Sequence, residues 1–343
     1  MKIQKAVLQH ALEKVSPGLA NKEIIEQSTH FAFIKDRVVT FNGEISVSCI
    51  VPGLDLEGAV SAKPLHQILA KIKKDEVDIT ITDEELLVSG GRAKAGLPIL
   101  AEVRLPIKEE IGAMGKWKPM PLGLQEAMQA CRFSASKDMS FATLTCVHVV
   151  KEGSLVESCD RSRLTRCTFE GVLPIGDFLI PAESVEALKA YSTASISVGD
   201  GWVHFMSEDK AVVFSCRIYN EQYPDLGKAM EMPEQIDIEF PPALMEILER
   251  ASVFTAKSEK NTQPFVEIAL SQKRIKIRAK GDAGWFEEEV NARYVGEPLT
   301  FTVNPDFLKE MLPKATQCAI GSQKLRFAGD NWEHIISMAT KGE

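Results

Sequence analysis

Long apolar runs are absent from this sequence of 343 residues. No stretch reaches the roughly 18 apolar residues that a membrane-spanning helix needs, so no association with a membrane is expected. Residues 1–15 mix Lys, Glu and His into an apolar pattern, which is typical of an amphipathic helix in the folded protein and not of a secretion signal. With 45% hydrophobic and 26% charged residues and no low-complexity tract, the composition is that of a soluble globular protein.

Motifs for metal binding, cofactor binding and catalysis are also absent. The seven cysteines are scattered and form no CxxC pair, which favours a cytoplasmic location and buried thiols over disulfides or zinc. The six histidines show neither HExxH nor His-x-His spacing, and no phosphate-binding loop of the GxxxxGKS or GxxxxGKT type occurs. We therefore expect no metal, no cofactor and no enzymatic activity, and we interpret acidic clusters such as residues 287–289 as solvated surface.

One pattern occurs three times along the chain. A short apolar strand passes into a helix at Ser61, Pro181 and Asn304, at separations of 120 and 123 residues. The residues just before these positions, and those four and seven places after them, are apolar: Val60, Ile180 and Val303, then Leu65, Val185 and Leu308, then Ile68, Leu188 and Met311. Apolar residues at this spacing mark one face of a helix. Because the period is far too long for a solenoid, each copy is expected to belong to a separate domain.

Each predicted domain contains two helices and several strands. The first helices cover residues 5–15, 122–133 and 243–254, and the second helices cover 64–74, 182–191 and 305–315. Strand patterns cover 31–34, 45–50, 77–81, 85–89 and 101–105, then 143–150, 154–157, 194–198, 202–206 and 211–218, then 265–270, 274–279, 317–321, 324–328 and 333–338. This order predicts an α+β fold with two helices on one face of an antiparallel sheet. Interrupted periodicity and Pro or Gly residues place the domains at 1–117, 118–236 and 237–343.

The charge is distributed unevenly between helices and strands. The net charge is −8, yet the six predicted helices hold ten Lys or Arg against eight Asp or Glu. Most of the excess comes from Lys71, Lys73 and Lys74. This sign suits helices that face phosphates, and such binding would be independent of sequence and sensitive to salt. Ordinary solvated helix faces explain the same charges equally well, so the charge alone leaves both interpretations open.

Several local motifs resemble those of a known family. Phe133-Ser134, Asp160 with Arg163-Leu164, Ile180-Pro181 and Tyr223-Pro224-Asp225 are similar, in this order, to the FS, TDGHRL, IVP and FPD segments of the bacterial sliding clamp, the β subunit of DNA polymerase III. The resemblance covers essentially the whole chain, with scattered identities. The chain departs from the family at Arg161-Ser162, where the family has Gly-His, and at its last residues, MATKGE. A divergent clamp encoded by a phage or plasmid, adapted to its own polymerase, would fit these departures.

The resemblance implies a fold and a function. Three clamp domains per chain would close into a ring by head-to-tail dimerisation, with the helices lining a central hole and the sheets outside. The ring would encircle double-stranded DNA without sequence specificity and would tether the DNA polymerase, which keeps synthesis processive by raising the effective concentration of the polymerase. The expected partners are DNA, a second copy of the chain, and the polymerase and clamp loader, which bind through short peptide motifs. Catalytic residues and cofactors are not implied.

The resemblance and the charge pattern together name three sets of site residues. The expected DNA-binding residues are Lys22, Lys71, Lys73, Lys74 and Lys137. The expected pocket for partner peptides contains Leu144, Arg163, Leu164, Pro224, Lys228 and Met338, with residues 334–338 as its far wall. The expected dimer interface contains Leu97, Val253 and Phe254, and the alternative interpretation of the last two residues is core packing at the end of a helix.

Two other functions compete with a DNA-encircling clamp. A clamp-like interaction scaffold that docks partners without encircling DNA is suggested by the weak basic lining of the middle domain, where residues 182–191 carry Glu183 and Glu186 against Lys189. An α+β enzyme that processes a sugar or nucleotide would need a convergent acid and base pair. The sequence offers no such pair.

Overall fold

The computed structural model describes residues 1–82, 84–255 and 264–339. Contacts divide the chain into two compact units. Unit 1 contains residues 1–129, 148–154 and 170–221, and unit 2 contains residues 130–147, 155–169 and those from 222 onward. Within the described ranges, no helix is both long and apolar enough to cross a bilayer. All seven cysteine thiols are free and buried, as predicted.

The elements follow one another in the order helix, strands, helix, strands. Up to residue 119 they are β1 Lys2–Gln4, α1 Lys5–Val15, η1 Ser16–Gly18, β2 His30–Lys35, β3 Arg37–Phe41, β4 Ile45–Ile50, β5 Leu56–Ser61, α2 Ala62–Lys71, β6 Glu76–Ile81, β7 Glu85–Gly90, β8 Ala93–Leu100, α3 Ile107–Ile111 and β9 Lys118–Pro119. Then come α4 Leu124–Arg132, η2 Met139–Thr145, β10 Cys146–Val150, β11 Leu155–Cys159, β12 Arg163–Thr168, β13 Phe178–Pro181, α5 Ala182–Leu188, β14 Thr193–Gly199, β15 Trp202–Ser207, β16 Val212–Arg217 and α6 Gly227–Met230. The last elements are β17 Ile236–Glu239, α7 Leu244–Ser252, β18 Val266–Ser271, β19 Arg274–Gly281, β20 Gly284–Asn291, β21 Leu299–Val303, α8 Pro305–Met311, β22 Gln317–Ile320, β23 Lys324–Ala328 and β24 Trp332–Ser337.

The repeated strand-to-helix joint is present three times, as predicted. Ser61, Pro181 and Asn304 are the N-cap residues of α2, α5 and α8, each in an extended conformation at the end of β5, β13 or β21. At Asn304 the side chain accepts a hydrogen bond from the amide of Asp306, which satisfies one of the free N–H groups at the helix start. The residues four places further on, Leu65, Val185 and Leu308, are all fully buried. The three copies therefore share one local geometry.

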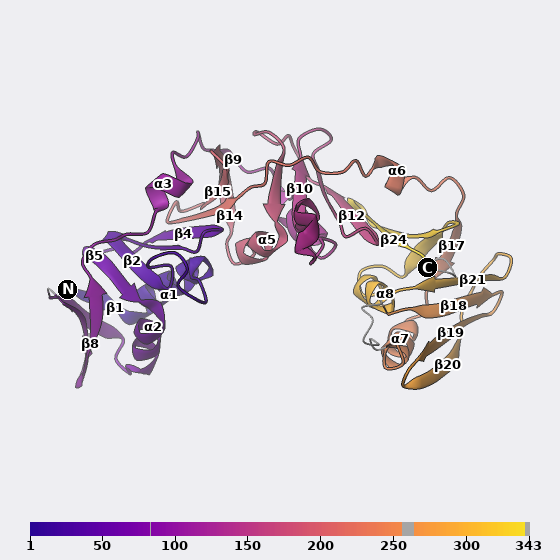
Figure 1. Ribbon diagram of the computed structural model, residues 1–343, viewed down its shortest axis with the longest axis horizontal. Coiled ribbons are helices and arrows are strands. Elements are labelled where there is room, and N and C mark those ends of the chain that lie inside the picture. Colours follow the sequence, from indigo (N-terminus) through magenta and orange to yellow (C-terminus); the bar gives the residue numbers. More distant parts are fainter. Residues whose placement is uncertain (83, 256–263, 340–343) are drawn as a thin grey trace. The chain divides into compact units, whose positions relative to one another are not determined.

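In unit 1 a 12-stranded sheet carries α1 and α2 on one face. Its order is β1-β6-β7-β8-β5-β2-β3-β4-β16-β15-β14-β9, and every pairing is antiparallel. Helix α1 packs against β3, β4 and α2 (Figure 1). Its buried residues are Leu8, Ala11, Leu12 and Val15, whereas Val7 is 42% exposed.

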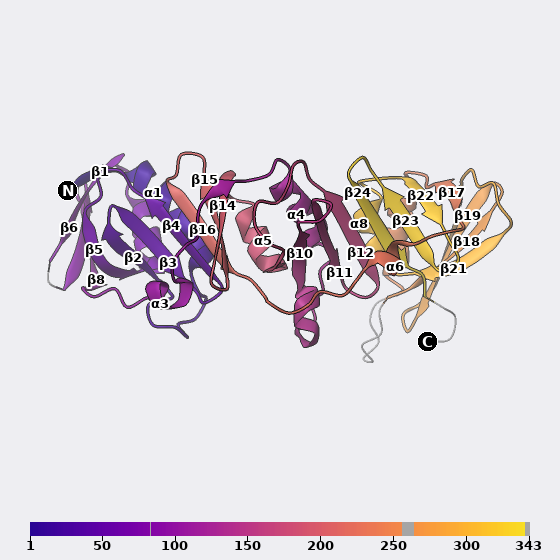
Figure 2. The same cartoon turned by 90° about the horizontal axis from the view of Figure 1, so that it is seen from above.

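In unit 2, helices α7 and α8 lie side by side, and α7 packs against β19 and β20 of a four-stranded sheet ordered β20-β19-β18-β21 (Figure 1). The buried side of α7 is Leu244, Ile247, Leu248 and Ala251, a spacing that places all four on one face. A second run of neighbouring strands in unit 2 has the order β11-β12-β24-β23-β22-β17, and β22, β23 and β24 are seen together in Figure 2. Helices and antiparallel sheets segregate as an α+β fold requires.

Two strand-pair junctions link distant parts of the chain. The first junction is the β4–β16 pair of unit 1 with the turn 42–45, and the second junction is the β12–β24 pair of unit 2 with the turn 160–163. In the first, Val47 lies opposite Phe214, and in the second, Thr165 lies opposite His334. Each junction pairs segments more than 160 residues apart, so each brings together side chains that the sequence alone does not associate.

Several predicted element bounds are corrected by the structure. The strand predicted at 101–105 is irregular, and the strand before it, β8, covers Ala93–Leu100 in spite of Pro98. The strand predicted from residue 143 begins at Cys146, because η2 occupies Met139–Thr145. Helix α2 ends at Lys71, since the buried Ile72 turns into an extended conformation. Lys73 and Lys74 therefore follow the helix instead of belonging to it.

Candidate functional site

The candidate site in unit 2 begins with the turn between β11 and β12. Asp160 holds this turn: its Oδ1 accepts the backbone N–H groups of Ser162 and Arg163, both at 3.0 Å. Its own amide donates to the carbonyl of Arg163 at 3.1 Å. Arg161 sits in the middle of the turn with a φ of 78°, a left-handed conformation that favours glycine. The strain at this non-glycine residue makes the turn unusual.

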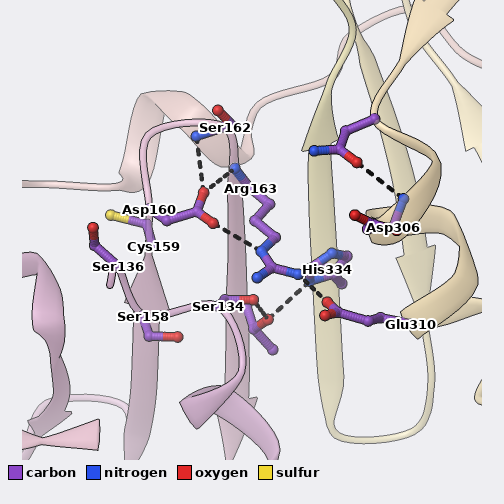
Figure 3. Close-up of polar contacts among 12 residues, drawn as sticks. Ser134, Ser136, Ser158, Cys159, Asp160, Ser162, Arg163, Asp306, Glu310 and His334 are labelled. Atoms are coloured by element: carbon purple, nitrogen blue, oxygen red, sulfur yellow. Dashed lines mark hydrogen bonds and ion pairs between the residues drawn. The ribbon is translucent and has the colours of Figure 1, made fainter. Parts of the chain in front are cut away.

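Arg163 is the centre of the polar contacts drawn in Figure 3. Its side chain is only 8% exposed. Its Nε donates to Asp160 Oδ2 at 2.9 Å, and its Nη1 pairs with Glu310 on α8. The guanidinium carbon lies 4.3 Å from the ring centre of Phe307 and 5.5 Å from that of Phe133. Two aromatic faces and two carboxylates thus stabilise a nearly buried positive charge.

Behind Arg163 lies a buried polar chain formed by Ser134, Thr165 and His334. The hydroxyls of Ser134 and Thr165 are hydrogen-bonded at 2.6 Å, and Thr165 Oγ1 is hydrogen-bonded to His334 Nδ1 at 2.8 Å. Burial, helped by the charges of Arg163 and Lys314, lowers the pKa of His334 to about 3. Burial also lowers the pKa of Lys314, whose Nζ lies 3.5 Å from the ring centre of Phe133. At neutral pH, His334 is therefore uncharged.

A cavity of about 770 Å³ opens beside Arg163. Its wall is polar and carries both signs of charge: Lys137, Arg161 and Arg163 with Asp138, Asp160, Asp306 and Glu310. Arg161 lies 4.8 Å above the ring of Phe141. Among residues 1–82, 84–255 and 264–339, no group of His, Cys, Asp and Glu side chains could hold a metal ion. The arrangement can bind a polar or charged group, and it holds β12 against α8.

The chain resembles bacterial DNA sliding clamps in sequence and in structure. It is 22% identical to the beta sliding clamp of Pseudomonas aeruginosa over 282 residues, which are 79% of this chain and 74% of that protein. The crystal structure of the DNA polymerase III beta chain from Streptococcus pneumoniae matches with a TM-score of 0.86 at 18% identity and covers 99% of both chains. The sliding clamp of Bartonella birtlesii, solved with bound griselimycin, matches with a TM-score of 0.85 at 14% identity and also covers 99% of both chains. No protein-family model matches the chain.

The chain has the fold of the bacterial sliding clamps. The resemblance on which the sequence-based prediction rested is therefore confirmed, as is the predicted α+β clamp architecture. Sequence identity stays between 14% and 22% in these matches, so the chain is a divergent version of that fold.

The structure places the residues of the predicted peptide pocket on both faces of the β12–β24 pair and in the segments beside it. Arg163 and Leu164 are neighbours in β12 and so point to opposite faces of the sheet. Arg163 faces the helices, whereas Leu164 lies opposite Ile335 on the other face. Leu144 and Leu164 are buried, and Pro224 and Lys228 are exposed. Met338 lines a separate cavity of about 260 Å³ with Thr302 and Gln323.

The lysines predicted to bind DNA are all exposed, as a contact with phosphates requires. Lys22 lies in the loop before β2, Lys71 is the last residue of α2, and Lys73 and Lys74 follow it. Lys137 belongs to unit 2 and lines the polar cavity beside Arg163. With the observed helix bounds the six helices lose their positive excess, because Lys73, Lys74, Lys189 and Lys314 lie beyond the helix ends.

The residues predicted at the dimer interface lie beside free sheet edges. Leu97 is half-buried in β8, whose residues 93–98 pair with β7 on one side only. Val253 at the end of α7 is 63% exposed. Phe254 stacks on Phe286 of β20 with 5.9 Å between ring centres, so the alternative prediction of helix-end packing describes Phe254 and does not describe Val253.

Sequence reasoning missed three of the residues that complete the Arg163 site, namely Phe307, Glu310 and Lys314, whereas His334 was predicted as part of the far wall at residues 334–338. Phe307, Glu310 and Lys314 belong to α8 and the segment after it, and His334 belongs to β24. Asp306, Glu310 and Lys314 were visible only as charges on a predicted helix. The family motifs mark Phe133-Ser134 and Arg163-Leu164 as parts of the site. The contact of these two segments with β24 depends on tertiary pairing.

Proposed function

We propose that the chain is a DNA polymerase processivity factor, a ring-shaped sliding clamp without catalytic activity. The observation that carries this proposal is the match along 99% of this chain and 99% of the Streptococcus pneumoniae beta chain, which leaves no clamp domain missing. In this proposal the chain forms three domains, at residues 1–117, 118–236 and 237–343. The same complete match supports a role in DNA replication over that of a sugar- or nucleotide-processing enzyme.

Two copies of the chain would close the ring head to tail through free sheet edges. Strand β20 lies at the end of its sheet in unit 2, and residues 93–98 of β8 have an open side in unit 1. Open edges of this kind readily pair with another strand. Val253 and Trp285, 63% and 72% exposed, supply apolar surface next to β20, and Leu97 supplies it on β8. Antiparallel pairing of β8 with β20 of a second copy would bury all three.

The DNA backbone in the hole of this ring would be contacted by five lysines: Lys22, Lys71, Lys73, Lys74 and Lys137. Contacts of lysine with phosphates carry no sequence information, which suits a ring that must slide. A charge-reversal series at Lys71, Lys73 and Lys74 should reduce the dependence of DNA retention on salt, by close to one unit of slope for each lost phosphate contact. An unchanged slope would mean that these lysines do not face DNA.

The outer side of the second junction would receive the polymerase and the clamp loader through short peptide motifs. Leu164 and Ile335 form an apolar pair on that side, and Tyr223 accepts the amide of Cys159 at 2.9 Å, which holds the segment before Pro224 against β11, the strand that pairs with β12. Lys228 is exposed nearby on α6 and would attract an acidic residue of the peptide. Met338 would form the far wall.

The topology of the bound DNA tests the proposal. A clamp loader would load the protein onto nicked circular DNA, and gel filtration would isolate the complex. The circle would then be cut with a restriction enzyme, and the protein that remains bound to DNA would be measured. Release on linearisation is expected, because a ring slides off a free end. If the protein stays bound after the DNA is linearised, the ring model is wrong.

A second candidate function is a clamp-like interaction scaffold that does not encircle DNA. The loss of the positive helix excess with the observed bounds supports this candidate. A scaffold would bind the polymerase peptide but would show no retention on circular DNA. Sedimentation of the protein at micromolar concentration separates the two further, since the ring requires a dimer and the scaffold does not.

A further inference from the structure

Unit 1 contains a groove of about 520 Å³ on the face of its sheet opposite α1. One wall is apolar and comes from Val103, Leu105 and Ile107, in the segment that follows β8. This segment is fixed at both ends. Gln27 bonds to the carbonyl of Glu102 and to the amide of Arg104, at 2.8 and 2.7 Å, and the indole of Trp202 donates to the carbonyl of Glu110 at 2.8 Å. The groove is therefore preformed.

The floor of the groove is lined by hydroxyl groups. Ser46 and Ser48 alternate on β4 and point to the same face, and Ser215 of β16 lies opposite Ser46. Ser48 accepts a hydrogen bond from Arg37 Nη1 at 3.4 Å, and Ser215 is bonded to His204 Nδ1 at 2.8 Å. The hydroxyl of Ser46 has no hydrogen-bond partner in the described part of the chain. A ligand with polar groups at a two-residue spacing would satisfy this floor.

The rim of the groove is acidic. Glu57 of β5 and Glu109 of α3 are the charged residues that line it, and both are exposed. Neither carboxylate has an ion-pair partner among the side chains that the structure describes. Arg37 stands near the floor, where its guanidinium contacts Ser48. Two unpaired carboxylates above an apolar wall are complementary to a positively charged group on an apolar ligand.

The turn chemistry shows that this groove is the counterpart of the outer side of the second junction. Asn42 Oδ1 accepts the amides of Glu44 and Ile45, as Asp160 Oδ1 accepts those of Ser162 and Arg163. Ser46 therefore occupies in the first junction the position that Leu164 occupies in the second. The two junctions present one backbone arrangement with different side chains.

We propose that this groove binds an extended peptide segment of a partner protein that carries apolar side chains flanked by Lys or Arg. The main chain of an extended peptide repeats its polar groups at the interval of Ser46 and Ser48, about 6.6 Å. Apolar side chains pack on Val103, Leu105 and Ile107, and a basic side chain pairs with Glu57 and Glu109. The cavity volume lies within the usual range for ligand sites, roughly 300–1,000 Å³. This assignment holds whether or not the chain encircles DNA.

Fluorescence anisotropy with the full chain tests the site. The probes are two fluorescein-labelled peptides, GKLSLK and its acidic counterpart GELSLE. The basic peptide should bind saturably and at least tenfold more tightly than the acidic one. The double variant with Glu57→Lys and Glu109→Lys should reverse this preference. Met114→Arg, at an exposed rim position of the groove, should weaken binding of the basic peptide at least tenfold without a change in the thermal unfolding midpoint of the protein.

The matched control carries Glu234→Lys and Glu239→Lys, two exposed carboxylates of unit 2. It changes the net charge by the same amount and should leave binding of both peptides unchanged. The proposal is overturned if the basic peptide does not bind, if both peptides bind equally, or if the unit 2 control weakens binding as much as the groove variants do.

Discussion

The first and second junctions have the same backbone and opposite polarity. In both, one side chain at the turn accepts two backbone amides. A strand from a later part of the chain also pairs in the same register: the amide of Arg217 donates to the carbonyl of Glu44, and the amide of Ser337 donates to the carbonyl of Ser162. On the helix side, the first junction has Ile45 and Phe214 where the second has Arg163 and His334. On the other side, the first junction has Ser46 and Ser215 where the second has Leu164 and Ile335.

This inversion teaches that the turn and the ladder define the junction, while the side chains decide what each face can bind. Main-chain hydrogen bonds are satisfied in both junctions whichever face is apolar. The first junction buries an apolar face against α1 and leaves hydroxyls in its outer groove. The second buries a charged network on its helix side and has an apolar pair, Leu164 and Ile335, on its other side. One repeat can therefore present two different binding surfaces.

The largest expected effect comes from removing the buried charge of the second junction. Arg163→Ala leaves Asp160 and Glu310 without their cation and empties the space between Phe133 and Phe307. Breaking a buried pair in this way should cost about 3–5 kcal/mol of the unfolding free energy of unit 2. Urea unfolding followed by hydrogen exchange of β12 and β24 amides measures it. Arg250→Ala, which removes an exposed pair with Glu288, is the control and should leave the midpoint nearly unchanged.

Converting the second junction to the residues of the first makes a sharper comparison. The double variant with Arg163→Ile and His334→Phe replaces the charged network by an apolar pair. Such replacements are often neutral or stabilising because the desolvation of the buried charges is avoided. We expect the double variant to recover at least half of the stability that Arg163→Ala loses. A double variant less stable than Arg163→Ala would show that the inner face of unit 2 cannot accept the packing of unit 1.

The next effect is a dependence of stability on pH that arises from buried histidine. His334 has a folded pKa of about 3 against an ordinary value near 6.5, so its contribution is complete above pH 6.5 and is lost as the pH falls. Protonation of one such histidine lowers the free energy of unfolding by about 2 kcal/mol between pH 6.5 and 5, because the unfolded chain binds the proton and the folded chain does not. Urea midpoints at these two pH values should differ less in His334→Phe than in the parent chain.

His204 complicates this measurement in a useful way. Burial lowers its pKa to about 4, so unit 1 should lose stability over the same range. Hydrogen exchange resolves the two units, because β15 carries His204 and β24 carries His334. His334→Phe should flatten the pH dependence of unit 2 and leave that of unit 1 as it is. An equal change in both units would contradict the assignment of the effect to His334.

The sequence predicted the parts of this fold that depend on local pattern. Ser61, Pro181 and Asn304 were identifiable because a buried strand and an amphipathic helix each leave a short-range signature. Lys73 and Lys74 fall within the helix predicted at 64–74, whereas the helix ends at Lys71 and the next residue, Ile72, is buried in an extended conformation. Arg163 and Leu164 were identifiable by motif, while the alternation of side chains along β12 places them on opposite faces of the sheet.

The parts that could not be predicted depend on pairing across long separations. His334 contacts Thr165 across 169 residues, and only the β12–β24 register decides that these two side chains meet. The groove of unit 1 has the same origin: Ser46 and Ser215 are ordinary strand serines until β4 pairs with β16. Periodicity identifies a strand and its buried face, but the partner strand comes from the global topology.

The smallest expected effect concerns the two turns. The first junction has Gly43 at φ 97°, and the second has Arg161 at φ 78° in the corresponding place. A left-handed conformation costs a residue with a Cβ about 1–2 kcal/mol, offset in part by the greater entropy that glycine loses on folding. Arg161→Gly should therefore stabilise unit 2 by about 1 kcal/mol in urea unfolding. Gly43→Ala should destabilise unit 1 by a similar amount or more, because the new Cβ would also lie 3.0 Å from Ile25 Cδ1.

Arg161→Ala separates the effect of the backbone from that of the side chain, since it removes the contact with Phe141 but keeps the backbone strain. If Arg161→Gly and Arg161→Ala gave the same stability, the contact of Arg161 with Phe141, and not the backbone, would account for the difference between the two turns.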